Sequence, residues 1–262
     1  MAHEEATTKP AATLLAADEP SAVAEYNTAG ASPFLLVCDH AGRRIPRRLR
    51  DLGLNEADLA RHIAWDIGIA GVARALADGL DAHLIMQIYS RLVIDCNRPP
   101  GSPTSIVRLS EGTLIPGNEN VSAEEVALRR REIFEPYHQA IERVLEARAQ
   151  ALRPTLLISL HSFTPVYAGI PRPWRAGVLY NRSSGLAHAL RDLLRAPGDI
   201  VVGDNEPYSV NDDTDYTIPV HGEKRGLAHV AIEIRQDLLG DDAGQEYWAN
   251  RLAELLPKAA GI

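Results

Sequence analysis

Residues 155–162 read TLLISLHS and form the most strand-like stretch of the chain. An apolar run of this length, directly preceded by Pro154, is typical of a strand buried on both faces of a parallel sheet. The run leads into His161 and Ser162, so we expect both residues at the carboxyl end of that strand. Open α/β sheets bind their ligands outside the carboxyl ends of the strands, which makes this position a candidate site.

The same arrangement occurs near the start of the chain. Residues 34–40 read FLLVCDH, a second short apolar run that ends on a histidine. Asn55 can cap a helix that runs to about Ala77, and a third apolar run follows over residues 83–88. The order strand, helix, strand favours a right-handed parallel crossover. The sequence therefore predicts an α/β fold.

The remaining segments continue the alternation. A capping box at Ser122 starts a long helix to about Leu152, which Pro136 is expected to bend. A loop over residues 99–120, rich in proline and glycine, is long enough to cover a site. Further elements are expected as strands over residues 177–180, 199–202 and 228–234 and as helices over 184–195 and 242–256.

Composition restricts the class of protein. The 262 residues are 45% hydrophobic with a formal net charge of −8, so we expect a globular domain over residues 31–262 behind an N-terminal extension over residues 1–30. An acidic chain without a long basic run is not expected to bind nucleic acid, and no apolar run is long enough for a membrane span. Two cysteines and no visible secretory leader favour the cytoplasm. The pattern does not indicate an oligomeric state.

Two histidines at the ends of separate strands suggest a metal site. His40 and His161, with one carboxylate and an open position, match a hydrolytic zinc site, in which the ion lowers the pKa of bound water to about 7. Asp66 is the best third ligand, because it lies on the apolar face of the expected helix, where an unpaired carboxylate is costly. His62 and Asp39 are the alternatives. Spacing alone leaves metal binding and a structural role equally open.

Glu233 is the candidate for proton transfer. It stands between two isoleucines in the expected strand 228–234, and a buried glutamate suits the general acid and base of an amide hydrolase. A structural ion pair with Arg235 or Arg91 is the alternative.

Several polar residues could bind a substrate carboxylate. Arg91, Asn97 and Arg98 surround a short apolar strand that leads into the long loop, and guanidinium groups bind carboxylates bidentately. Arg235 is a further candidate of the same kind. His221, in a polar loop, could line the site. Structural roles for these arginines remain equally open.

Taken in order, these motifs resemble a known family. Over residues 30–256 the chain is similar to the N-formylglutamate amidohydrolase family, in the segments CDHAG (38–42) with IP (45–46), HIAWDIG (62–68), SRL (90–92), DCNRP (95–99), SLHSF (159–163), GDNEPY (203–208) and IEIR (232–235).

The resemblance implies a three-layer α/β fold, with a mostly parallel central sheet and helices on both faces, similar to zinc-dependent exopeptidases. It also implies hydrolysis of N-formyl-L-glutamate to formate and L-glutamate by zinc-bound water, the last step of one route of histidine degradation. A more distant likeness to zinc amidases that cut cell-wall peptides supports His40, Asp66 and His161 as ligands and Glu233 as acid and base. The expected partner is a small acidic acyl-amino acid.

Three alternatives stay open at this point. Another divalent metal would suit the same ligands. A zinc amidase or peptidase with a different acylated or glutamate-containing substrate would share the same motifs. A protein that binds an acidic amino acid without catalysis would use the same pocket.

Overall fold

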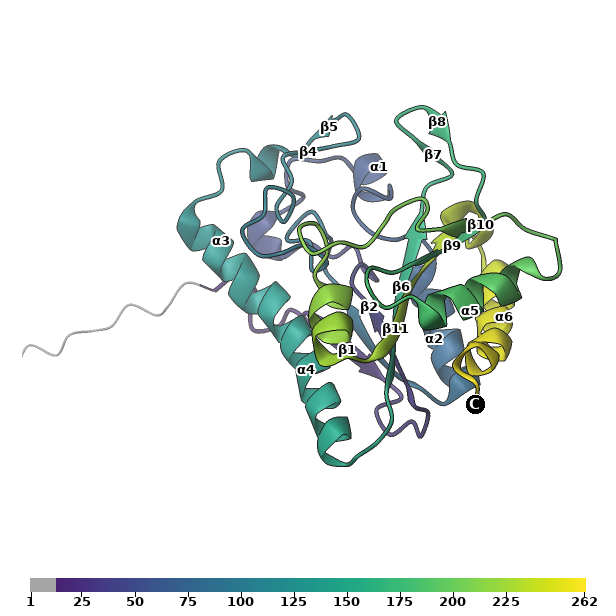
Figure 1. Cartoon of the computed structure of the whole chain (residues 1–262). Coiled ribbons are helices and arrows are strands. Elements are labelled where there is room, and N and C mark those ends of the chain that lie inside the picture. The colour runs from purple at the N-terminus through teal and green to yellow at the C-terminus, as the bar shows by residue number, and fades with distance from the viewer. Residues whose placement is uncertain (1–12) are drawn as a thin grey trace, which may run out of the picture.

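A seven-stranded sheet forms the middle of the molecule in the computed structural model, which describes residues 13–262 (Figure 1). In spatial order its strands are β1 (Val23–Tyr26), β3 (His83–Gln87), β2 (Phe34–Cys38), β6 (Leu156–Phe163), β11 (Ala228–Arg235), β9 (Ala176–Leu179) and β10 (Val202–Asp204). Strands β3, β2, β6 and β11 are parallel to one another, and β9 is parallel to β10. Only the β1–β3 and β11–β9 pairs of this sheet are antiparallel, so the predicted mostly parallel sheet is confirmed.

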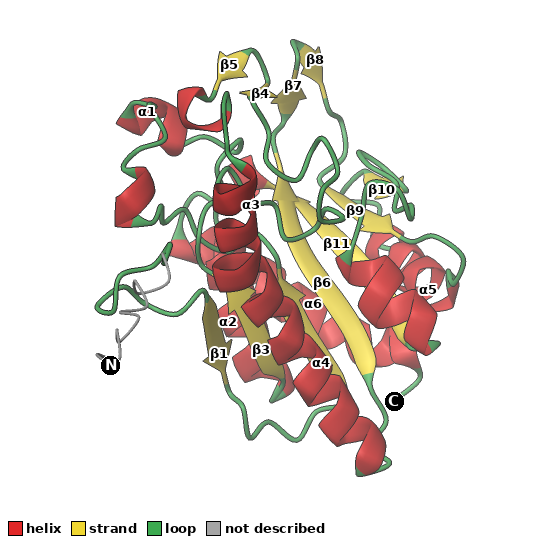
Figure 2. Ribbon diagram, turned by 90° about the vertical axis from the view of Figure 1, so that its left-hand side faces the viewer, coloured by secondary structure: helices red, strands yellow, loops and turns green. Residues whose placement is uncertain are grey.

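Helices cover both faces of this sheet (Figure 2). One layer consists of α2 (Ile69–Leu80), α5 (Gly185–Arg195) and α6 (Asp242–Ala260), with α6 in contact with both of the others. The opposite layer consists of α3 (Ala123–Arg129) and α4 (Glu135–Gln150). Successive residues of a strand point to opposite faces, so Leu36 of β2 enters the core under α2 while Val37 enters the core under α4. The predicted three-layer arrangement is confirmed.

The segment between β2 and β3 differs from its prediction. Instead of one helix from Asn55 to Ala77, a short helix α1 (Glu56–Leu59) is separated from α2 by an irregular stretch that contains Asp66. Gly68, with a φ of +78°, starts α2, and a Cβ there would lie 2.4 Å from the Leu239 Cβ. The backbone N–H of Asp66 donates to the His40 carbonyl at 3.0 Å. Tertiary contacts therefore break the helix that periodicity predicted.

Three other expectations need adjustment. A π-helical turn (Arg130–Phe134) separates α3 from α4 just before Pro136, where a wider turn accommodates a residue without an N–H donor. Residues 91–97 form turns rather than the expected apolar strand. Strand β10 begins at Val202 rather than at residue 199, whereas His161 and Ser162 lie at the carboxyl end of β6 as expected.

Two hairpins stand at the carboxyl ends of the parallel strands (Figures 1 and 2). The long loop over residues 99–120 contains β4 (Leu109–Ser110) and β5 (Thr113–Leu114), and the second hairpin consists of β7 (Val166–Tyr167) and β8 (Ile170–Pro171). The carboxylate of Glu111 accepts a hydrogen bond from the Ala168 N–H at 3.2 Å, which links the two turns. A covering role for the long loop stays a prediction.

The expected N-terminal extension lies partly outside the described residues. Where the structure describes it, from Thr13 onward, the chain packs on the body: Leu14 is buried and β1 pairs with β3. This agrees with the expected contact of its last third, while the boundary at residue 30 stays a prediction. Within residues 13–262, none of the helices has the length and apolar character that crossing a membrane requires.

Candidate metal centre and active-site cavity

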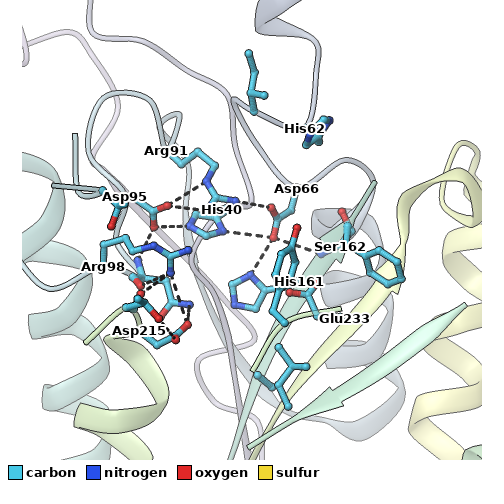
Figure 3. Close-up of a pocket in the computed structure, with 18 of the residues that line it drawn as sticks. His40, His62, Asp66, Arg91, Asp95, Arg98, His161, Ser162, Asp215 and Glu233 are labelled. Atoms are coloured by element: carbon cyan, nitrogen blue, oxygen red, sulfur yellow. Dashed lines mark hydrogen bonds and ion pairs between the residues drawn. The ribbon is translucent and has the colours of Figure 1, made fainter. Parts of the chain in front are cut away.

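A cavity of about 440 Å³ opens where β2, β6 and β11 end (Figure 3). Its walls include His40, Asp66, His161 and Glu233, which are far apart in the sequence. A volume of this size suits a small-molecule ligand. The cavity therefore lies where the strand pattern predicted a site.

Strand register places His161 beside Glu233. In the parallel pair of β6 and β11, His161 is directly opposite Glu233. Their neighbours Leu160 and Ile232 point into the core under α2, α5 and α6, so both polar side chains point to the other side of the sheet. Two adjacent strands thus deliver an imidazole and a carboxylate to one wall.

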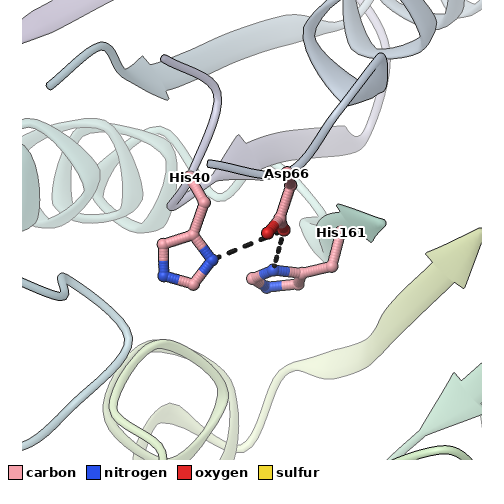
Figure 4. A group of neighbouring side chains, drawn as sticks. All are labelled: His40, Asp66 and His161. Carbon is pink, nitrogen blue, oxygen red and sulfur yellow. Dashed lines mark hydrogen bonds and ion pairs between the residues drawn. The ribbon is translucent and has the colours of Figure 1, made fainter. Parts of the chain in front are cut away.

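The three residues expected to bind a metal lie together (Figure 4). His161 Nδ1 is 2.9 Å from Asp66 Oδ2, and His40 Nδ1 is 3.4 Å from the same oxygen. One donor atom from each residue lies within 4.8 Å of the others, and all three side chains are buried. His62 and Asp39, the alternatives for the third ligand, are not part of this cluster.

A second carboxylate approaches the far side of each imidazole. His40 Nε2 lies 2.7 Å from Asp95 Oδ1, and His161 Nε2 lies 3.2 Å from Asp39 Oδ2. A histidine that ligates a metal usually donates its other ring N–H to such a group, which fixes the ring and its tautomer. With Nε2–H directed at the carboxylates, each Nδ1 would be free to give its lone pair to a bound metal in place of its contact with Asp66.

One buried atom of this cluster lacks a hydrogen bond. His40 Nδ1 is buried and has no hydrogen-bond partner within the described residues, because its approach to Asp66 is an ion-pair contact only. Leaving a buried polar atom unsatisfied is costly. Two Nδ1 atoms and one carboxylate are also the ligand types that zinc prefers, so the residues fit a divalent metal such as zinc.

Neighbouring charges and hydrogen bonds keep the carboxylates of Asp66 and Asp95 ionised. Burial would raise the pKa of Asp66, but the charge of His40 and a hydrogen bond from His161 bring it well below its usual range. Burial would likewise raise the pKa of Asp95, yet the charges of Arg91 and His40 bring it well below its usual range. Both carboxylates are therefore ionised at neutral pH.

Glu233 differs from these carboxylates. Burial raises its pKa to about 7, with the charge of Asp66 adding to the increase while His161 and Arg91 oppose it. Its Oε2 is buried without a hydrogen-bond partner in the described residues. A carboxyl group poised near neutrality suits general acid and base chemistry.

Three of the residues predicted to bind substrate line the cavity, and each of them also has partners within the chain. Arg91 donates to Asp95 Oδ2 through Nε (3.1 Å) and Nη2 (2.7 Å). Asn97 Oδ1 accepts from the backbone N–H groups of Tyr216 and Thr217. Arg98 donates to the Thr214 carbonyl at 2.6 Å and keeps further N–H groups available.

Two other predicted residues do not reach the cavity, and both assignments are corrected. Arg235 is captured two residues further on by Asp237, which accepts at 2.7 and 3.1 Å. His221 is wholly buried in a π-helical turn (Ile218–Gly222), where its ring stacks on His138 with Nε2 2.9 Å from Nδ1 of that residue. Neither side chain lines the cavity.

Some site residues were missed by the sequence reasoning. Asp95 interrupts the apolar run LVIDC, and a lone carboxylate in such a run was the signal that could have identified it. Glu111, which lies 3.0 Å from His62 Nε2, and Tyr208 also line the cavity. Both are on loops, where periodicity carries no information.

The fold and the cavity define an α/β protein with a buried histidine and carboxylate centre at the carboxyl ends of its strands. The family model for N-formylglutamate amidohydrolase matches residues 32–240, and the chain belongs to this family. The family places it among the amidohydrolases, as the sequence motifs predicted.

Individual relatives agree with this assignment. The chain is 31% identical over 143 residues to N-formylglutamate deformylase of Pseudomonas putida, a match that spans 51% of this chain and about half (52%) of that protein. A crystal structure of a gene product from Agrobacterium tumefaciens superposes with a TM-score of 0.92 at 37% identity, over 95% of this chain and 98% of that one. An N-formylglutamate amidohydrolase from Ralstonia eutropha JMP134 shares the fold, with a TM-score of 0.64 at 18% identity over 93% and 100% of the chains.

Proposed function

We propose that this chain hydrolyses N-formyl-L-glutamate, or a closely related N-acyl amino acid, to the free acid and the amino acid in a zinc-dependent reaction. The observation that carries the proposal is the convergence of His40, Asp66 and His161 beside Glu233 in one cavity. The family and the names of the relatives support formylglutamate as the first substrate to test.

His40 Nδ1, His161 Nδ1 and the Asp66 carboxylate would hold the metal. A bound zinc ion supplies Lewis-acid chemistry: it lowers the pKa of water and polarises the amide carbonyl. Asp95 and Asp39 keep the two imidazoles oriented through Nε2. Arg91, which donates to Asp95 and approaches Asp66 Oδ1 at 3.4 Å, balances the negative charge of the carboxylates.

Glu233 would carry the proton. Its carboxylate takes a proton from the attacking water and returns it to the nitrogen of the leaving amine as the amide bond breaks. Its buried position next to His161 keeps this proton away from bulk solvent. Arg98, with N–H groups still available at the cavity wall, would help to hold a substrate carboxylate. We expect the reaction to take place in the cytoplasm, at the end of a route of histidine degradation.

The proposal is tested with the purified full-length chain. We expect about one zinc ion per chain by elemental analysis and formate release from N-formyl-L-glutamate. Glu233→Gln should retain the zinc and lose about 10²- to 10⁴-fold in kcat, because only the proton carrier is removed. Wild-type turnover in that zinc-loaded variant would exclude Glu233 from the reaction.

The choice of substrate is tested in the same assay. N-Acetyl-L-glutamate and glutamate-containing muropeptides are the comparison substrates. Faster hydrolysis of either one would move the assignment to another amidase, and zinc-free protein without hydrolysis would indicate a binding protein.

A further inference from the structure

Arg172 is a buried arginine that packs against three aromatic rings of the cavity wall. It has no carboxylate partner in the part of the chain that the structure describes. It directly follows β8, and its backbone N–H donates to the Pro165 carbonyl at 2.8 Å, which closes the base of the β7–β8 hairpin. Its exposed fraction is only 9%. A guanidinium group cannot lose its proton, so a permanent charge is buried here.

The other arginines of this region have acidic neighbours. Arg91 is paired with Asp95, and Arg98 lies 3.6 Å from Asp215. The only hydrogen-bond acceptor described for the Arg172 side chain is the hydroxyl group of Tyr208, at 2.9 Å from Nη1. A buried charge without a counter-ion is unfavourable, and an anionic ligand would correct this.

Aromatic rings hold the Arg172 guanidinium in place. Its central carbon lies 4.7 Å from the ring centroid of Tyr167, 4.7 Å from that of Tyr208 and 5.9 Å from that of Phe163. Stacking on ring faces stabilises the cation and leaves the N–H edge of the planar group for an acceptor. All three rings line the cavity that contains His161 and Glu233.

Tyr208 extends this arrangement into the cavity. Because its oxygen accepts from Arg172, the hydroxyl proton is left to donate, and no acceptor for it occurs among residues 13–262. This hydroxyl lies on the cavity wall, and the guanidinium that donates to it is a second donor directly beside it. A carboxylate is the planar acceptor that such a pair of donors recognises.

We propose that Arg172 and Tyr208 form a carboxylate-binding subsite that selects acyl amino acids with a free carboxylate group. The inference rests on the proposed function, because it identifies the residues that recognise the acidic part of that substrate. Arg91 and Asn97 then organise the centre rather than the substrate.

The subsite is tested by calorimetric titration of the zinc-loaded protein with glutarate, a dicarboxylate without an amide bond. Arg172→Met should weaken glutarate binding by about 10- to 100-fold, as expected for the loss of a charge-assisted bidentate pair. Tyr208→Phe should weaken it by about 5-fold. In the double variant the two effects should be less than multiplicative, since both donors serve one carboxylate.

Arg251→Met is the matched control. Arg251 lies on α6 and also stacks on an aromatic ring, that of Trp248, but it is paired bidentately with Asp199. Its variant should bind glutarate within about 2-fold of wild type, the size of effect expected away from the ligand. Arg172→Lys keeps the charge without the planar guanidinium group, so its glutarate affinity should lie between those of wild type and Arg172→Met. This variant also controls for a loss of folding in Arg172→Met.

The outcomes separate the subsite from the proposed reaction. Equal glutarate affinity in wild type and Arg172→Met overturns the subsite, even if the wild type hydrolyses formylglutamate. Binding that depends on Arg172 in a protein that hydrolyses no acyl amino acid supports the subsite and refutes the proposed reaction. When both hold, Arg172→Met should raise KM for formylglutamate more than it lowers kcat.

Discussion

At the scale of single residues, the carboxylates behind the histidines matter as much as the expected ligands. Asp95 and Asp39 do not belong to the His40, Asp66 and His161 cluster, yet each contacts the Nε2 atom of one imidazole. Without them either ring could rotate or adopt the other tautomer, and the Nδ1 atoms would no longer point to a common centre.

Replacing Asp95 should therefore weaken metal binding although no ligand is removed. We expect Asp95→Asn to lower zinc affinity by about 10- to 100-fold, because the amide is a weaker acceptor for His40 and does not neutralise Arg91. Competition with a chromophoric chelator measures this affinity. Asp237→Asn is the control, since Asp237 also pairs with an arginine but lies away from the cavity. Unchanged affinity in Asp95→Asn would show that His40 does not need this partner.

At the scale of elements, the break between α1 and α2 positions Asp66, the proposed third ligand. A continuous helix would have carried Asp66 along its surface, whereas the irregular stretch returns it to His40 through a backbone hydrogen bond. Gly68 makes this path possible, because its φ is positive and the Leu239 side chain occupies the place of a Cβ.

Gly68→Ala should therefore destabilise the fold more than the same substitution at a glycine whose only constraint is a positive φ. We expect a loss of about 2–4 kcal/mol in the free energy of unfolding, from backbone strain and the clash with Leu239. Gly198→Ala is the matched control, with a φ of +72° and no atom within 4 Å of the added Cβ, and should lose only about 1 kcal/mol. Urea denaturation measures both. Equal losses of unfolding free energy in the two variants would mean that the contact with Leu239 does not add to the destabilisation.

At the scale of the whole molecule, the layer that contains α4 encloses a pair of neutral histidines. Burial lowers the pKa of His138 from 6.5 to about 4 and that of His221 from 6.5 to about 3, with the neighbouring His138 contributing in the second case. His138 Nε2 also lies 2.8 Å from the Cys96 carbonyl. The pair therefore joins α4 to the segment that contains Cys96 and to the π-helical turn that contains His221.

This pair predicts a loss of stability in mild acid. The unfolded chain takes up protons near pH 6.5 while the folded chain does not, so the stabilising effect is complete above that pH and decreases from about 6.5 to 4. The decrease amounts to a few kcal/mol by linkage. Urea denaturation between pH 7 and 4 measures it. His138→Gln/His221→Gln should be less stable overall but show a smaller slope with pH, and an equal slope would contradict the assignment.

The sequence by itself determined the class of fold and the firmest site residues. Buried parallel strands need continuous apolar runs, so 34–38, 83–87 and 156–160 could be recognised locally, together with the histidines that follow two of them. The isoleucines on both sides of Glu233 likewise indicated a buried carboxylate.

Only the tertiary structure decided how those residues meet. The break before α2, the partner of His221, and the contacts of Asp95 and Arg172 depend on segments distant in the sequence. Periodicity reports which face of an element is buried, but not which charge or ring lies opposite it. The centre is therefore visible in the sequence as separate histidines and acids, and it becomes a single site only because the sheet places the ends of its strands together.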